Sequence, residues 1–161
     1  MVTFLVFSTQ LQGMEKMILP TNELKTVVTT WIKAYENRNL DTMKSLFAAS
    51  PETFHYGTGT DEMMYGFEGM MQQLSRDWSQ SEGAQLKLHG FRAQQVAPTV
   101  AWIACELEPV IIISGQKAAL PLLRATMVVV KENSGWKIAH SHASWPYSEQ
   151  AVGQSFPEVK S

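Results

Sequence analysis

Two histidines separated by one residue, His140 and His142, are the side chains whose type and spacing point most directly to chemistry. They lie in the segment Gly135–Ser144, whose composition and flanking turn residues predict the last β-strand of the chain. Side chains alternate between the two faces of a strand, so both imidazoles should share one face with Trp136 and Ile138. Imidazole titrates near neutral pH and can exchange a proton with a bound molecule. We therefore expect a binding site on this face.

The strands that precede this segment offer partners for the histidines. A register that places Glu106 opposite Arg124, and Thr126 opposite His142, gathers the polar side chains on one face and leaves the reverse face apolar. Because a buried carboxylate needs a partner, this register is preferred to one shifted by one residue. We predict that His142 and Glu106 are catalytic, with His142 exchanging a proton and Arg124 helping Glu106 to orient it. The alternatives are a structural Glu106–Arg124 ion pair and histidines that are ordinary hydrogen-bonded strand residues.

Metal binding is not expected at this site, although the His-x-His spacing could place two rings on one ion. No cluster of cysteines and histidines accompanies the pair, which argues against a zinc site. Cys105 is the single cysteine and has no neighbour that marks it as a nucleophile. We therefore predict neither a metal nor a cofactor.

The elements that must position these residues begin with two helices. Apolar residues recur at helical spacing from Leu24 to Tyr35 and predict an amphipathic helix over about 22–37. A polar break at 37–39 separates it from a shorter helix over Leu40–Phe47. After a short strand at Thr53–Tyr56, a third helix has one apolar side that includes Met70 and Trp78.

From Gln85 onward apolar and polar residues alternate as they do in β-strands. Four successive antiparallel strands are predicted, with Gly90 marking a bulge that bends the first of them. Helices gathered on one side of an antiparallel sheet make an α+β domain. Long strands that bend at a bulge should curl around the helices and leave a cavity between the two layers.

The order of elements and several short motifs resemble the nuclear-transport-factor-2-like superfamily, with its cystatin-like cone fold, and specifically its SnoaL-like branch. The resemblance runs from about residue 22 to residue 145, and the closing strand is its most specific part. The motifs that carry it are Trp31-x3-Tyr35, Asn39-Leu40-Asp41, Gly66-Phe67-Glu68, Ala101-Trp102, Arg124-Ala125-Thr126 and Gly135-Trp136-Lys137-Ile138-x-His140-x-His142-x-Ser144.

This resemblance implies a cone-shaped, strongly curved antiparallel sheet packed on three N-terminal helices. It also implies an open mouth that holds a small apolar or aromatic molecule, and a dimer formed through the sheet. The superfamily includes isomerases, dehydratases, cyclases and hydrolases as well as non-catalytic binding modules, so the fold alone does not fix the function. We expect either general acid–base chemistry on a small molecule or a non-catalytic ligand-binding or protein-association module.

Further residues are expected to contact the ligand from the walls of the cone. Aromatic side chains should supply much of such a wall, with polar groups at one end. The expected ligand-binding residues are Tyr35, Phe54, Tyr56, Trp78, Trp102, Arg124, Thr126 and His140. His55, Tyr56 and Asp61 flank a loop that could form the mouth, and their individual roles stay open.

Length and composition set the remaining bounds. The chain has 161 residues, a net charge of −2 and one cysteine, which suits one cytoplasmic domain and gives no electrostatic case for nucleic acid or an anionic membrane. We expect the domain to cover 21–146, between an N-terminal extension (1–20) and a polar tail (147–161). The unbroken apolar runs Ile111–Ile113 and Val128–Val130 suggest that both sheet faces are covered, and so predict a homodimer through the outer face.

Overall fold

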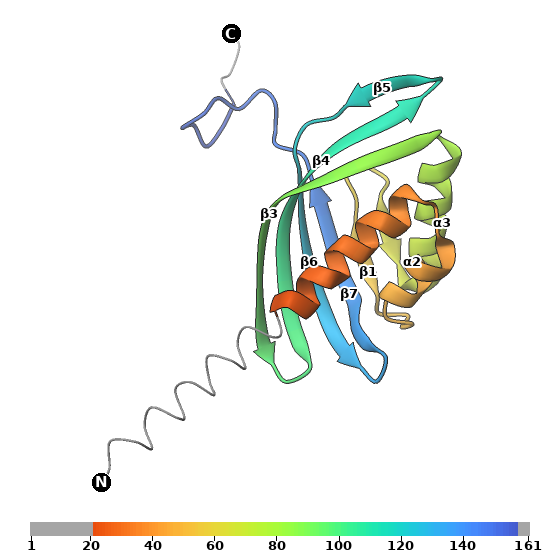
Figure 1. The fold of residues 1–161 in the computed structure, drawn as a ribbon. Coiled ribbons are helices and arrows are strands. Elements are labelled where there is room, and N and C mark those ends of the chain that lie inside the picture. The colour runs from red at the N-terminus through yellow and green to blue at the C-terminus, as the bar shows by residue number, and fades with distance from the viewer. Residues whose placement is uncertain (1–20, 158–161) are drawn as a thin grey trace.

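The computed structural model describes residues 21–157, which contain the predicted helices (Figure 1). The described part of the first helix covers residues 21–36, α2 spans Leu40–Leu46 and α3 spans Gly66–Ser79. Asn39 caps α2, because its side chain accepts a hydrogen bond of 2.9 Å from the Thr42 amide. The end of the first helix and both ends of α2 agree with the predicted helices to within one residue, and α3 contains the apolar side predicted for the third helix. Among residues 21–157, no helix is long and apolar enough to cross a membrane.

The strands form one sheet of seven in the order β2-β1-β7-β6-β4-β3, with β5 paired to β4. Two short strands, β2 and β5, were not predicted. The pairing of β1 with β7 is parallel, so the predicted purely antiparallel sheet is wrong at this one place. The strand bounds are β1 Phe54–Tyr56, β2 Met63–Tyr65, β3 Gly83–Ala97, β4 Val100–Ile113, β5 Gln116–Ala119, β6 Leu123–Glu132 and β7 Gly135–Ser144.

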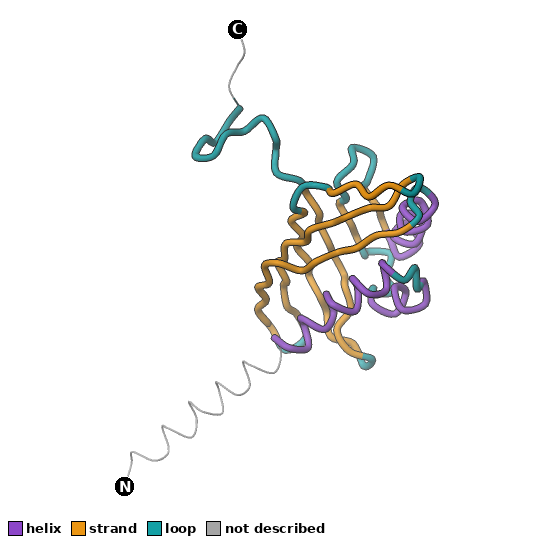
Figure 2. The backbone as a smooth tube through the Cα atoms, turned by 45° about the horizontal axis from the view of Figure 1, so that its top comes forward, coloured by secondary structure: helices purple, strands orange, loops and turns teal. Residues whose placement is uncertain are grey.

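The long strands curve around the helices, which all lie on one face of the sheet (Figures 1 and 2). The core lies between these two layers and includes Leu24 and Val28 of the first helix, with Ile103, Val129 and Ile138 of the sheet, all no more than 1% exposed. No helix among residues 21–157 covers the opposite face of the sheet. The α+β cone fold expected from the sequence is confirmed.

A β-bulge bends β3 where the sequence predicts one. The register between β3 and β4 shifts between Leu88 and Phe91, so the prediction of a bulge at Gly90 is confirmed. A Cβ atom at Gly90 would lie 3.1 Å from the Glu106 carboxylate, so glycine makes room for that side chain.

A second irregularity changes the face on which the closing histidines lie. Val128 pairs with His140 and Val129 pairs with Ile138, so one residue of β7, Ala139, has no partner on β6. An extra residue in one strand reverses the alternation beyond it. Ile138 therefore points into the core, whereas His140 projects from the outer face. The prediction that Trp136, Ile138, His140 and His142 share one face is wrong for this reason.

The predicted strand register is correct, but the predicted faces are inverted. Glu106 pairs with Arg124, and Thr126 pairs with His142, as the polar pattern indicates. The alternate positions are buried against the helices, with Leu107 1% and Met127 5% exposed. Apolar side chains gain most from burial, so the helices cover the apolar face and the polar face is left outside.

Candidate functional site

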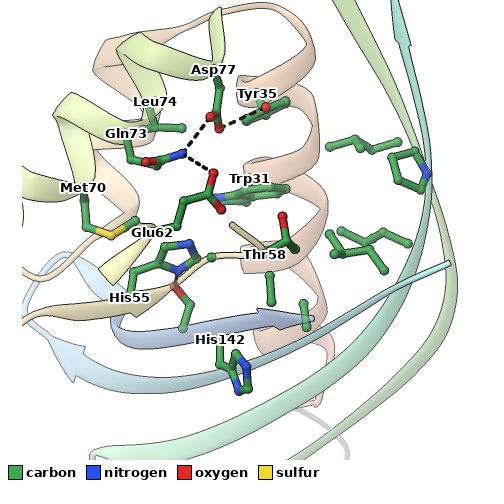
Figure 3. Close-up of a pocket in the computed structure, with 18 of the residues that line it drawn as sticks. Trp31, Tyr35, His55, Thr58, Glu62, Met70, Gln73, Leu74, Asp77 and His142 are labelled. Atoms are coloured by element: carbon green, nitrogen blue, oxygen red, sulfur yellow. Dashed lines mark hydrogen bonds between the residues drawn. The ribbon is translucent and has the colours of Figure 1, made fainter. Parts of the chain in front are cut away.

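A cavity of 330 Å³ lies between the helices and the concave face of the sheet (Figure 3). This volume is in the range of small-molecule pockets. Most of its wall is apolar, and its polar side chains gather on the side of α3. The apolar and aromatic lining includes Trp31, Phe47, Met70, Leu74, Leu86, Leu107, Ile111, Leu123, Ala125, Met127 and Ile138.

Helix α3 presents two polar side chains to this cavity from within an apolar stripe. Met70, Gln73, Leu74 and Asp77 all line it, and their spacing places them on one face of the helix. Gln73 is 6% exposed, and its Nε2 donates hydrogen bonds to Asp77 Oδ1 at 2.8 Å and to Glu62 Oε1 at 3.1 Å. The Tyr35 hydroxyl donates to Asp77 Oδ2 at 3.2 Å. A chain of hydrogen bonds thus joins Glu62, Gln73, Asp77 and Tyr35 (Figure 3).

The loop between β1 and β2 holds Glu62 in place through two glycines. The Gly59 amide donates to Glu62 Oε2 at 2.8 Å. A Cβ atom at Gly57 would lie 2.2 Å from that same oxygen, so any other residue there would displace the carboxylate. Arg76 binds Glu62 at 2.8 Å and Asp61 at 2.7 Å. The segment Gly57–Gly59 therefore holds the Glu62 carboxylate in the site.

His55 is the half-buried imidazole of this cavity. The parallel pairing of β1 and β7 puts it beside Ser141, and its Nδ1 lies 2.8 Å from Ser141 Oγ. Its ring lies close to the Glu62 side chain (Figure 3). Because Ser141 engages Nδ1, Nε2 is the ring nitrogen left to meet a bound molecule.

The protein environment shifts the pKa values of the titratable groups in this cavity in different directions. Burial lowers the pKa of His55 below its usual value, and the charge of Glu62 and the bond to Ser141 offset this only in part. Burial raises the pKa of Asp77, and the nearby Glu62 charge raises it further. Burial also raises the pKa of Tyr35, followed by the effect of Asp77. Burial opposes ionisation of Glu62, but hydrogen bonds from Gly59 and Arg76 outweigh it and lower the pKa of this carboxyl.

These shifts give the groups that line the cavity different protonation behaviour. His55 is neutral at pH 7 and can accept a proton, Tyr35 keeps its proton, and Asp77 holds its proton to a higher pH than an exposed aspartate. Neighbouring titratable groups whose pKa values are pushed apart are typical of acid–base sites.

The residues predicted from the sequence are divided between the cavity and the outer face. Tyr35 lines the cavity. His142 borders it but is exposed on the outer face opposite Thr126, and its ring lies on the other side of β7 from His55 (Figure 3). The His142 ring packs edge-on against Tyr56 at 5.7 Å. Trp78 packs against Tyr35 at 6.2 Å and is not part of the lining.

The remaining predicted residues project from the outer face. Glu106, Arg124, Thr126 and Trp102 occupy the exposed positions of β4 and β6, so their predicted place inside the cone is wrong. Within residues 21–157, no ion pair joins Glu106 to Arg124.

Phe54 and His140 belong to an aromatic group on the same outer side. Their rings stack at 5.5 Å, and the Phe54 ring also contacts Tyr56 at 4.5 Å. His140 Nδ1 lies 3.0 Å from the Phe54 carbonyl oxygen, which makes it a hydrogen-bonded strand residue, one of the alternatives considered from the sequence.

Glu62, Gln73 and Asp77 are site residues that the sequence did not predict. The available signal was the pair Gln73 and Asp77, four residues apart on the apolar side of a helix. A polar pair at core positions needs a buried partner, and Glu62 supplies it. In the described part of the chain, no group of three or more histidine, cysteine, aspartate or glutamate side chains could hold a metal ion.

Comparison with known proteins agrees with this architecture. The family model described as SnoaL-like domain matches residues 24–148. The chain belongs to the SnoaL-like domain family. No curated protein matches the sequence.

Solved structures show how widely this SnoaL-like fold is shared. A proposed dehydratase of the NTF2-like family from Streptomyces avermitilis superposes with a TM-score of 0.72 at 18% identity, covering 81% of this chain and 98% of the other. An NTF2-like superfamily protein from Salmonella enterica gives 0.72 at 20% identity, covering 84% and 96%. A proposed scytalone dehydratase from Novosphingobium aromaticivorans gives 0.72 at 10% identity, covering 89% and 96%. At these identities the likeness shows the fold alone.

The electrostatic description of His55 can be tested by NMR titration. Its pKa should lie below 6.5, because burial disfavours the imidazolium. The Glu62→Gln variant should lower this pKa further, because it removes the negative charge that favours the imidazolium. The matched variant Glu132→Gln, at the end of β6, should leave it unchanged. A His55 pKa above 6.5, or one that rises in Glu62→Gln, would contradict the description.

Proposed function

We propose that this SnoaL-like protein binds a small apolar or aromatic molecule in its cone and catalyses a proton transfer on it. Isomerisation, cyclisation and dehydration are reactions of this kind. The observation that carries the proposal is His55, a neutral imidazole beside the Glu62–Gln73–Asp77–Tyr35 chain in an apolar cavity of 330 Å³.

In this proposal His55 Nε2 removes a proton from a carbon of the ligand, and the same nitrogen returns it elsewhere. The Tyr35 hydroxyl and the Gln73 amide both donate hydrogen bonds to Asp77, so the α3 side presents carboxylate oxygens to the polar end of the ligand. Gln73 positions Asp77 and Glu62 through its two hydrogen bonds. The apolar walls exclude water, which strengthens these interactions.

The state of the cavity favours this role over that of an association module with a filled cone. The cavity is open enough to hold a ligand and has a polar end. Structurally similar proteins include proposed dehydratases from Streptomyces avermitilis and Novosphingobium aromaticivorans, although a proposed kinase association domain from Thiobacillus denitrificans shares the fold at a TM-score of 0.65.

A variant of His55 provides the direct test of catalysis. A ligand is first identified by native mass spectrometry of the purified protein or by thermal-shift screening of aromatic and polyketide-like compounds. Exchange of its acidic carbon-bound proton with D₂O is then followed by ¹H NMR. His55→Gln should slow this exchange by about 10²- to 10⁴-fold, the usual contribution of a general base, with ligand affinity changed little.

The pH dependence of the same exchange follows from the lowered pKa of His55. The rate should be level above pH 6.5 and fall as the pH drops through the pKa, because imidazolium cannot accept a proton. His89→Gln serves as the control, because His89 lies on β3 and pairs with Glu108 at 2.6 Å. Unchanged exchange in His55→Gln would refute the catalytic role.

We also propose that two copies pair through the outer face of the sheet. Trp102 and Val128 are register partners there, and each leaves more than a third of its surface exposed, 37% and 38%. Tyr56, 39% exposed, and Tyr65, 66% exposed, extend the apolar surface across β1 and β2. Burying such a surface favours association.

Light scattering at micromolar concentration tests this pairing. The wild-type chain should have the mass of a dimer, and Trp102→Glu should have the mass of a monomer because it places a charge in the interface. Val152→Glu, which alters an exposed position in the tail, should remain dimeric. A monomeric wild-type chain would exclude the proposed dimer.

A further inference from the structure

We infer that the ligand of this cavity meets the α3 side with a hydrogen-bond-donating end that carries no negative charge, such as a hydroxyl or an amine. The inference rests on the proposed function and specifies its substrate class. It follows from the charge, the hydrogen-bonding balance and the shape of the cavity wall.

The charge of the wall is negative. Glu62 and Asp77 line the cavity, and no lysine or arginine of the described residues does so. Arg76 is the nearby cation, and its guanidinium already binds both Glu62 and Asp61. One guanidinium thus stands against three carboxyl groups.

The other charged group near this end does not restore the balance. Arg38 lies outside the lining and donates its hydrogen bond to the Ser81 carbonyl on the rim. An incoming carboxylate or phosphate would therefore be desolvated beside like charge without a cation of its own. A neutral or cationic group does not meet this penalty.

The hydrogen bonds of the α3 cluster lead to the same conclusion, because the donors of this cluster are already used by its own carboxylates. The Gln73 amide nitrogen is used by Glu62 and Asp77, which leaves Gln73 Oε1 buried and without a hydrogen-bond partner among the described residues. The reverse orientation of this amide would turn its oxygen toward two carboxylates. Trp78 Nε1 is also buried without a partner, but Trp78 does not line the cavity. The acceptors that the lining offers to a donor on the ligand are the carboxylate oxygens of Glu62 and Asp77.

The rest of the wall fixes the other end of the ligand. Leu86, Leu107, Ile111 and Leu123 line the cavity from the long strands β3, β4 and β6. In contrast, Glu62, Gln73 and Asp77 cluster on the α3 side (Figure 3). A bound molecule can satisfy both surfaces by placing an apolar body against the sheet and a donor against α3.

Three probes with one ring system separate these charge states: 2-naphthylmethanol, 2-naphthylmethylamine and 2-naphthoate. Their dissociation constants for the full chain at pH 7 are measured by calorimetry or by ligand-observed NMR. The alcohol or the amine should bind at least about tenfold more tightly than the carboxylate, since tenfold corresponds to one modest electrostatic contact. Preference for the amine would indicate recognition of positive charge, and equal binding of alcohol and amine would indicate recognition of the donor. Both outcomes support the inference.

Variants then assign the selectivity to the acidic end. Glu62→Gln should reduce the ratio of the dissociation constant of the carboxylate to those of the other two probes by several-fold. Asp77→Asn is the second variant if Glu62→Gln does not fold. Glu132→Gln, remote at the end of β6, is the matched control and should keep the wild-type ratio. Thermal melts establish that each variant is folded.

Two results would overturn the inference. The first leaves the proposed function intact, and the second refutes it as well. Binding of 2-naphthoate as tight as that of the alcohol and the amine would refute the charge argument, while leaving a ligand-binding cone in place. Binding of none of the probes, together with no response to the wider aromatic screen, would refute the proposed function and the inference with it.

Discussion

The structure depends on the burial of the apolar face of the curved sheet against the helices. Ile103, Leu107, Val129 and Ile138 are at most 1% exposed, and fully burying each such side chain stabilises the fold by about 1.5–3 kcal/mol. This requirement decides which face of every strand points inward. The polar face of β4 and β6 is consequently outside, and the interior site must be built from other elements.

Those elements are the parallel β1–β7 pair, the glycine-containing loop after β1 and the inner face of α3. Together they place His55, Glu62, Gln73 and Asp77 at one end of an otherwise apolar cavity. Burial removes water from these polar groups. Hydrogen bonds from Gln73 to Glu62 and Asp77 compensate for the lost hydration. The same burial shifts their pKa values in opposite directions, so that structural stability and potential reactivity have one physical origin.

Local pattern was sufficient to predict the helices, the Gly90 bulge and the register of Glu106 with Arg124, since each depends on residues within one or two neighbouring elements. It was insufficient for the site, because the extra residue at Ala139 reverses the face of β7 and no local signal marked it. The parallel pairing that brings His55 to Ser141 joins segments 86 residues apart. Contacts between such distant segments depend on how the whole chain folds, and the local spacing of apolar residues does not reveal them.

We propose above all that a small molecule occupies the cavity beside His55. A crystal structure of the protein with a ligand found by native mass spectrometry tests it most directly. We expect the apolar body of the ligand to lie against Leu107 and its reacting carbon to lie next to His55 Nε2. A cavity closed by side chains, or a ligand bound only on the outer face of the sheet, would rule out the proposed site.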